Sequence, residues 1–166
     1  VLPLRAPRTD LKNLSGRSIA PEFVPRPVYT LRVVLGPQDD AFSPEGIRTF
    51  LTQTYTVTPQ SDRMGCRLEG AAVQHTAPAD IISDGIAFGA IQVPSSGMPI
   101  IMLADRQTTG GYTKIANVIT ADFRILGQLK AGDKLRFEGV SIQHAQDALL
   151  TQRKALHNLR HALQVC

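Results

Sequence analysis

Tryptophan is absent from this 166-residue chain, and aromatic residues make up only 5% of it. Proteins that bind single-stranded nucleic acid stack bases on aromatic side chains placed among basic ones, and the sequence has no such platform. The net charge is +4 and the pI about 9.4, but the lysines and arginines are dispersed along the chain. We therefore expect no nucleic-acid partner.

Cysteine is also scarce. Cys66 and Cys166 are far apart, and neither belongs to a motif with the spacing of metal ligands. His157 and His161 are four residues apart on a predicted helix, but no third ligand lies near them in the sequence, so a solvated helix face is the better interpretation. We predict no metal site, and the low cysteine content favours a reducing, cytoplasmic compartment.

Long apolar runs are missing as well. No run approaches the about 18 residues of a membrane-spanning helix, so we expect no membrane partner. The N-terminus lacks the apolar core of a signal peptide. The nucleotide-binding patterns GxGxxG and GxxxxGK[ST] are absent too. The chain is 43% hydrophobic, which is typical of a globular domain with a real core.

Short strand patterns separated by turn residues run through most of the chain. Leu31 and Val33 alternate with less apolar residues, as expected of a strand with one buried face. Further strands are predicted at 54–58, 66–69, 72–75, 89–93, 98–103, 115–121 and 134–140. Many short strands of this kind favour a mainly β fold, a closed or nearly closed antiparallel barrel.

Two helices accompany the predicted strands. Ser43, Pro44 and Glu45 have the residue types of a helix N-terminus, which predicts a short helix over 43–53 that plugs the barrel. Ser141 precedes a long amphipathic pattern of apolar residues, namely Ile142, Ala145, Leu149, Leu156, Leu159 and Leu163. We expect this C-terminal helix to dock on the barrel, or alternatively to pair with a partner helix.

The stretch Leu103–Asp122 organises the candidate site. An apolar run leads into it, and a β-rich run leads out, so it predicts two strands joined by a polar loop. In one interpretation the loop is a turn: Asp105 satisfies backbone amides and Gly110-Gly111 supplies positive φ. In the other it binds an anion or amide through Arg106, Gln107, Thr108, Thr109, Gly110 and Gly111.

Gln92 is a second candidate because it interrupts an apolar strand. A polar side chain in such a place is either paired in the core or directed at a ligand. The sequence leaves both possibilities open.

Five blocks of sequence, in order, resemble the second half of the biotin-dependent carboxyltransferase family, also called allophanate hydrolase subunit 2, which includes the C subunit of 5-oxoprolinase. They are TPQSDRMG (58–65), SDG (83–85), GAIQVP (89–94), GMPI (97–100) and ADRQTTGGY (104–112). Cys66 stands where the family usually has an aromatic residue, and Thr113 where it usually has proline.

The resemblance implies a cyclophilin-like barrel over residues 30–166. It also implies that the Pro-rich segment 1–29 is an arm or linker from a missing N-terminal half. The family members act with companions, so the expected partners are an allophanate hydrolase subunit 1 type protein and a further 5-oxoprolinase subunit. The implied substrate is a small amide or lactam, with ATP, shared with the companions, or carboxybiotin as cofactor. An isolated fragment would then lack part of the site.

The resemblance also suggests roles for individual side chains. Arg63 and Arg106 would hold carboxylate, phosphate or carboxybiotin oxygens. Gln92, Gln107 and Thr108 would orient the amide. The candidates for proton transfer are Asp105, Tyr112 and Lys114. For Asp105 we favour the alternative role of holding Arg106 in place.

The resemblance leads to two candidate enzyme activities and to one alternative function that is not enzymatic. The chain is expected to belong to an ATP-dependent 5-oxoprolinase or to a urea/allophanate-type carboxyltransferase. It contains no biotin-carrier lysine motif, which favours the first. The alternative is a non-catalytic regulatory module that binds a companion subunit, of the kinase-inhibitor antagonist type.

Overall fold

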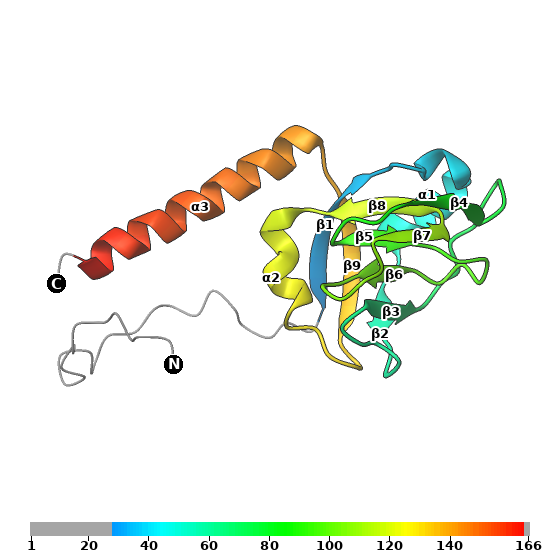
Figure 1. Ribbon diagram of the computed structural model, residues 1–166, viewed down its shortest axis with the longest axis horizontal. Coiled ribbons are helices and arrows are strands. Elements are labelled where there is room, and N and C mark those ends of the chain that lie inside the picture. The colour runs from blue at the N-terminus through cyan, green and yellow to red at the C-terminus, as the bar shows by residue number, and fades with distance from the viewer. Residues whose placement is uncertain (1–27, 165–166) are drawn as a thin grey trace.

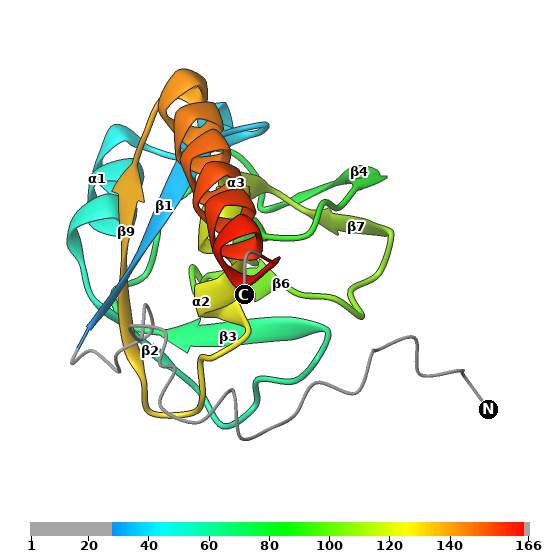
Figure 2. The same cartoon turned by 90° about the vertical axis from the view of Figure 1, so that its left-hand side faces the viewer.

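A closed barrel of seven strands forms the body of the molecule (Figures 1 and 2). The structure is a computed structural model and describes residues 28–164, with side chains described to residue 158. The strand order around the barrel is β1-β8-β5-β6-β3-β2-β9. These strands are β1 (Tyr29–Leu35), β2 (Tyr55–Val57), β3 (Gly65–Glu69), β5 (Ala90–Gln92), β6 (Ile100–Met102), β8 (Lys114–Val118) and β9 (Lys134–Gly139).

The first and last strands close the barrel. They run parallel, with Leu31 opposite Phe137, whereas every other pair of neighbouring barrel strands is antiparallel. The predicted mainly β barrel is thus confirmed, but its antiparallel order is broken at the closing pair. Two parallel neighbours need a long connection between them, and here the rest of the barrel supplies it.

Helix α1 (Pro44–Thr52) is the predicted short helix. Ser43 is its N-cap, and the Ser43 hydroxyl accepts a hydrogen bond from the Gly46 amide at 2.9 Å. Its buried residue Phe50 stacks on Phe137 of β9, with ring centroids 4.3 Å apart. The helix follows β1 after the short 3-10 helix η2 (Asp39–Ala41), and it covers the end of the barrel at which β1 and β9 finish.

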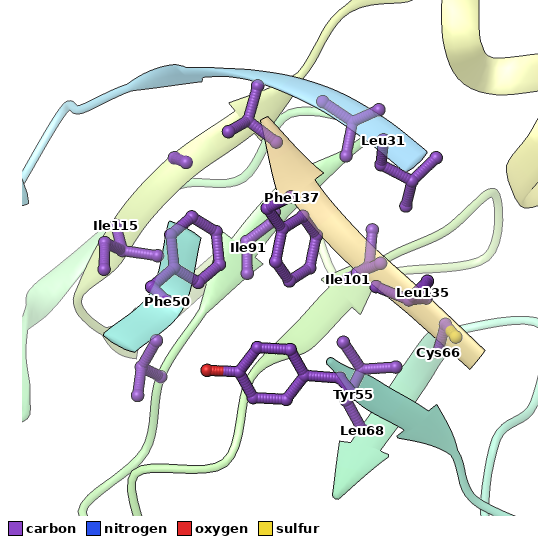
Figure 3. Packing of buried hydrophobic residues seen from close by; sticks show 14 of the residues in the cluster. Leu31, Phe50, Tyr55, Cys66, Leu68, Ile91, Ile101, Ile115, Leu135 and Phe137 are labelled. Atoms are coloured by element: carbon purple, nitrogen blue, oxygen red, sulfur yellow. The ribbon is translucent and has the colours of Figure 1, made fainter. Parts of the chain in front are cut away.

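The core fills the barrel from all of its strands (Figure 3). The fully buried side chains of Leu31, Ile91, Ile101 and Leu135 come from four different strands. Alternate residues on each strand point inward, so an alternating sequence pattern buries one face against the others. The Tyr55 hydroxyl is buried among them and has no hydrogen-bond partner in the described part of the chain.

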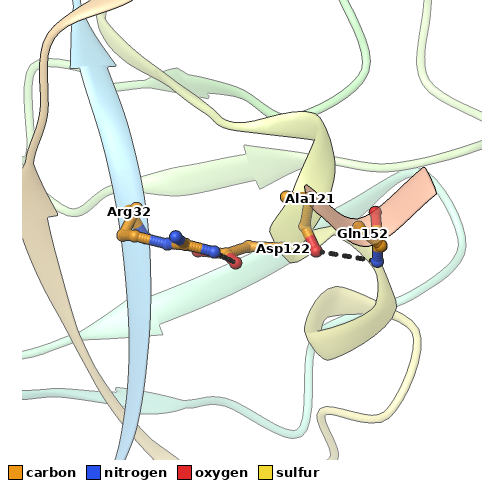
Figure 4. Close-up of polar contacts among 4 residues, drawn as sticks. All are labelled: Arg32, Ala121, Asp122 and Gln152. Carbon is orange, nitrogen blue, oxygen red and sulfur yellow. Dashed lines mark hydrogen bonds and ion pairs between the residues drawn. The ribbon is translucent and has the colours of Figure 1, made fainter. Parts of the chain in front are cut away.

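The segment after β8 turns into helices rather than extending the strand. Predicted strand 115–121 ends at Val118, and η3 (Thr120–Asp122) and α2 (Phe123–Leu126) follow. Asp122 explains the turn: its carboxylate accepts hydrogen bonds from the Arg32 main-chain amide at 2.9 Å and from Arg32 Nε at 3.0 Å (Figure 4). Burial of a carboxylate is tolerated when it is paired in this way.

Helix α3 (Ile142–Gln164) is the predicted long helix, and Ser141 caps it by accepting from the His144 amide at 3.1 Å. Gln152 donates to the Ala121 carbonyl at 3.4 Å and ties the helix to η3 (Figure 4). The expected docking of its apolar face is only partial, because Ile142 and Leu156 are 65% and 61% exposed. Figure 1 shows the helix extending past the barrel. Among the described residues, no helix is both long and apolar enough to span a membrane.

A separate two-stranded sheet, which we call the side sheet, consists of β4 (Asp80–Gly85) and β7 (Thr109–Tyr112) and lies beside the barrel (Figure 2). The sequence predicted only glycine loops at these two places. Gly110 and Gly111 lie in β7 and are not among the positive-φ glycines, so the prediction that they supply positive φ is wrong. Predicted strand 72–75 forms a single bridge, between Phe42 and His75.

Some of the predictions concern residues outside the described range. The Pro-rich segment predicted over 1–29 is described only at its last two residues, and Cys166 lies beyond the described range. The side chains of His161, Leu159 and Leu163 on α3 are also outside it.

Candidate functional site

Lys114, at the start of β8, is the chemically most unusual residue of the described chain. It is only 2% exposed, and its Nζ atom lies 3.1 Å from Asp84 Oδ2. The approach does not have the geometry of a hydrogen bond, and no other acceptor contacts Nζ among the described residues. An ammonium group has three N–H donors, so the approach to Asp84 leaves most of the donor capacity of Lys114 without a partner among the described residues.

Asp84 and Gln38 hold the lysine in place. Gln38 accepts a hydrogen bond from the Lys114 main-chain amide at 3.1 Å and donates one to Asp84 Oδ2 at 3.2 Å. The Lys114 ammonium, the Gly85 amide and the Gln38 amide together hold the pKa of Asp84 below its usual value. Asp84 is therefore ionised at neutral pH and supplies the counter-charge that a buried lysine needs.

Gln92, at the end of β5, lies beside this group and pairs with Lys114 across the strands. It is 5% exposed, and its Nε2 donates to the Tyr112 carbonyl at 3.4 Å. A Cβ atom added at Gly110 would lie 3.0 Å from Gln92 Nε2 and 2.6 Å from Ile86 Cδ1. Glycine in β7 therefore lets the side sheet approach the barrel closely, rather than making a turn.

Arg106 acts as a brace in this structure. Its Nε donates to the Ile86 carbonyl at 3.0 Å and its Nη1 to the Leu103 carbonyl at 3.2 Å. Its guanidinium carbon lies 5.8 Å from the centre of the Phe88 ring. These contacts join the β6–β7 connection to the segment after β4, and the predicted role of Arg106 in substrate binding stays a prediction.

Asp105 pairs with Arg63, so the prediction that it holds Arg106 in place is wrong. Asp105 Oδ2 lies 2.9 Å from Arg63 Nε, and both side chains are exposed. The reason is in the main chain: the Asp105 amide donates to the Arg63 carbonyl at 3.0 Å, which sets the two loops side by side. Gln107, Thr108 and Thr109, which follow Arg106, are exposed, and so is Tyr112 at the other end of β7.

The predicted site residues fall into two groups at opposite ends of the barrel. Strands β5 and β6 are antiparallel, so Gln92 at the end of β5 and Leu103 just after β6 lie at opposite ends. Lys114 and Tyr112 belong with Gln92, whereas Arg63 and Asp105 belong with Leu103. The single shared cleft that the sequence suggested is therefore not formed by these residues alone.

The group around Lys114 has the chemistry to hold a small planar substrate. The ammonium can donate to a carboxylate or carbonyl oxygen, and the Gln92 side chain can pair with an amide. Sequence reasoning singled out Lys114 and Gln92 but missed Asp84 and Gln38. Asp84 lies in the SDG block, which was a usable signal, whereas nothing in the sequence marks Gln38.

Comparison with known proteins assigns the chain to a family. The family model described as the carboxyltransferase domain, subdomain A and B, matches residues 1–139. This chain belongs to the carboxyltransferase domain family. The match stops at the end of β9, so α3 lies beyond the part of the carboxyltransferase domain that the family model covers.

Relatives of this carboxyltransferase domain include two bacterial proteins. The C subunit of 5-oxoprolinase from Haemophilus influenzae is 50% identical over 91 residues, which cover 55% of this chain and 29% of the relative. Its counterpart from Escherichia coli is 34% identical over 129 residues, covering 78% and 42%. The chain thus spans less than half the length of these curated relatives.

A solved structure agrees with the fold. The urea amidolyase of Kluyveromyces lactis superposes with a TM-score of 0.77 at 26% identity, over 83% of this chain and 9% of that chain. The carboxyltransferase domain described here therefore shares its barrel with a segment of a much longer enzyme.

Proposed function

We propose that this chain is part of a 5-oxoprolinase C subunit that, together with companion subunits, couples ATP hydrolysis to the opening of 5-oxoproline. In that reaction water adds to the lactam carbonyl carbon, the C–N bond breaks, and glutamate carries the new carboxylate and amine. The 50% identity to the Haemophilus influenzae protein supports this choice of branch. The proposed companions are an allophanate hydrolase subunit 1 type protein and a further subunit that shares the ATP.

One observation carries the proposal, namely the buried ammonium of Lys114 with Asp84 as its one counter-ion in the described chain. 5-Oxoproline has a carboxylate and a lactam group, and both are oxygen-rich and planar. In the proposed complex, Lys114 donates to one of these oxygens and Gln92 pairs with the lactam amide. Tyr112 is 41% exposed, and its main-chain carbonyl accepts the hydrogen bond from Gln92.

A second candidate function is carboxyl transfer from carboxybiotin to a small amide such as urea. The likeness to the Kluyveromyces lactis urea amidolyase favours it. The same ammonium would then hold the oxygens of the carboxyl group that is transferred. These 166 residues contain no biotin-carrier lysine motif, so carboxybiotin would be supplied from outside them.

The test uses the full-length subunit that contains this sequence, reconstituted with its companions. Lys114→Met keeps the length of the side chain but removes the charge. We expect turnover of 5-oxoproline to fall by about 100-fold or more, as for the loss of a key polar group at a reacting centre. The melting temperature should change little, because the partner left behind, Asp84, is exposed and stays solvated, so no charge is left buried without a partner.

Lys134→Met is the matched control, since Lys134 is exposed on β9. It should leave turnover unchanged. Full turnover by the Lys114→Met complex would remove Lys114 from the site. A wild-type complex that assembles but turns over neither 5-oxoproline nor urea would instead favour the regulatory module of the kinase-inhibitor antagonist type.

A further inference from the structure

A cavity of about 290 Å³ opens at the end of the barrel opposite Lys114. It lies where β2 ends, β3 begins and β6 ends, and the α2–β9 connection forms its far wall. We call it the barrel-mouth cavity. Its volume is at the lower end of the range of about 300 to 1,000 Å³ that is typical of small-molecule sites, and barrel mouths are frequent places for such sites.

The floor of the barrel-mouth cavity is apolar. Val57, Cys66 and Leu126 line it and are all less than 5% exposed. Leu103 and Leu129 complete the walls and pack against the main core. Burial raises the pKa of the Cys66 thiol to about 11, so this side chain is neutral at physiological pH and adds to the apolar floor.

One polar group of the cavity wall has no partner in the described part of the chain. Thr58 lines it, and the Thr58 Oγ1 atom is buried with no hydrogen-bond partner among the described residues. A buried hydroxyl without a partner is costly, and a water, an ion or a ligand can satisfy it. Ser61, by contrast, is already bonded to the Arg67 main chain, accepting at 2.9 Å and donating at 3.3 Å.

The charged groups at the rim are paired within the protein. Asp62 accepts from the Met64 and Gly65 amides at 2.8 and 3.0 Å. Arg63 pairs with Asp105 at 2.9 Å, and Lys130 pairs with Asp133 at 3.0 Å. The two cations of the rim are thus paired with carboxylates, and the rim offers no unpaired cation that would select an anionic ligand.

We propose that the barrel-mouth cavity is a second ligand site, distinct from the Lys114 site, for a compact neutral molecule with an apolar body and one hydrogen-bonding hydroxyl or amide group. The apolar body occupies the floor formed by Val57, Cys66 and Leu126. The polar group bonds to the Thr58 hydroxyl, which a rotation of the Thr58 side chain turns toward the cavity. Because this site uses none of the residues around Lys114, it stands or falls independently of the proposed function.

The experiment titrates the full chain with 2-phenylethanol, a neutral probe of this kind, and follows amide signals by NMR. We expect saturable shifts at 57–66 and 126–131, and at least about tenfold weaker binding of the charged analogue phenylacetate. Thr58→Val, which keeps the shape and removes the hydroxyl, should weaken binding about fivefold, the equivalent of one neutral hydrogen bond.

Two variants that fill the cavity complete the test. Cys66→Phe fills the floor, and Ala131→Phe narrows the mouth from an exposed loop position where folding is not at risk. Both should abolish the shifts, whereas Ala77→Phe, on an exposed loop near α1, should leave them unchanged. Absence of saturable shifts in the wild type, retained binding in Ala131→Phe, or shifts centred on Lys114 would each overturn the proposal.

Discussion

The Lys114–Asp84 pair joins a buried cation to an exposed carboxylate, and this asymmetry determines how each residue responds to substitution. Asp84 is exposed, so water still solvates its carboxylate when Lys114 is replaced. Lys114 is buried, so its ammonium cannot reach water when Asp84 is neutralised. Replacing Asp84 should therefore harm the fold more than replacing Lys114, because it leaves an uncompensated buried charge.

We predict that Asp84→Asn lowers the melting temperature at neutral pH more than Asp80→Asn, the matched change at an exposed position of the same strand. The pKa of Asp84 is lowered in the folded state, so its contribution to stability is complete above its unfolded value near 4. That contribution is lost as the pH falls through the lower folded value. Thermal unfolding from about pH 6 to pH 2 should show the wild type converging on Asp84→Asn below about pH 4. A constant gap over this range would contradict the assignment.

Tyr55 gives a second prediction for a single residue. Its hydroxyl is buried without a described partner, and burial raises the pKa of Tyr55 to about 12. Tyr55→Phe removes a polar group that has no hydrogen bond, so the free energy of unfolding should stay the same or rise by up to about 1 kcal/mol. Urea denaturation measures this directly, and a loss of more than about 1 kcal/mol would mean that the hydroxyl is bonded in solution.

Among the elements, α1 depends on a close contact with the segment after β3. Gly46 is buried in the first turn of α1, and a Cβ there would lie 2.3 Å from the Gln74 carbonyl oxygen. Alanine normally favours a helix over glycine by about 1 kcal/mol. At Gly46 the atom in the way belongs to the Gln74 main chain, which cannot move aside as a flexible side chain can. We therefore expect alanine to destabilise the protein here.

We predict that Gly46→Ala lowers the free energy of unfolding by about 1 to 3 kcal/mol, the usual cost of overpacking. Gly127→Ala is the control, because a Cβ at Gly127 has its nearest neighbour at 3.9 Å and its φ of −69° suits alanine. It should change stability by less than about 0.5 kcal/mol. Equal effects of the two substitutions in chemical denaturation would argue against the contact with Gln74.

The elements also show where sequence reasoning succeeds. Alternation in 31–35 and the Ser43-Pro44 start of α1 are local signals, and both are confirmed. The side sheet was missed because its two strands are far apart in sequence and each contains glycine and polar residues that are typical of turns. The pairing of Asp105 with Arg63 was missed for a related reason, since only the contact between two distant loops decides it. Gln38 reaches Lys114 across 76 positions of sequence, which no local pattern can reveal.

For the molecule as a whole, the two ends of the barrel are predicted to be energetically independent. Lys114 lies at one end and Thr58 at the other, and they share no contact. The stability changes of Lys114→Met and Thr58→Val should add within about 0.5 kcal/mol in the double variant. Lys114→Met and Asp84→Asn share an ion pair, so their double variant should deviate clearly from additivity. Chemical denaturation of the single and double variants gives a coupling energy for each pair of substitutions. Similar coupling energies for the two pairs would contradict the separation of the two ends.

The parallel pairing of β1 with β9 has a consequence for how the protein is made. Among the barrel strands, β1 is synthesised first. Its parallel neighbour β9 is complete only when residue 139 has been added. Until then β1 and β2 each lack the neighbour that β9 will provide, and unpaired strand edges recruit other chains. A nascent chain stalled before residue 134 would thus be an open, aggregation-prone sheet, and chaperone protection matters most in that interval.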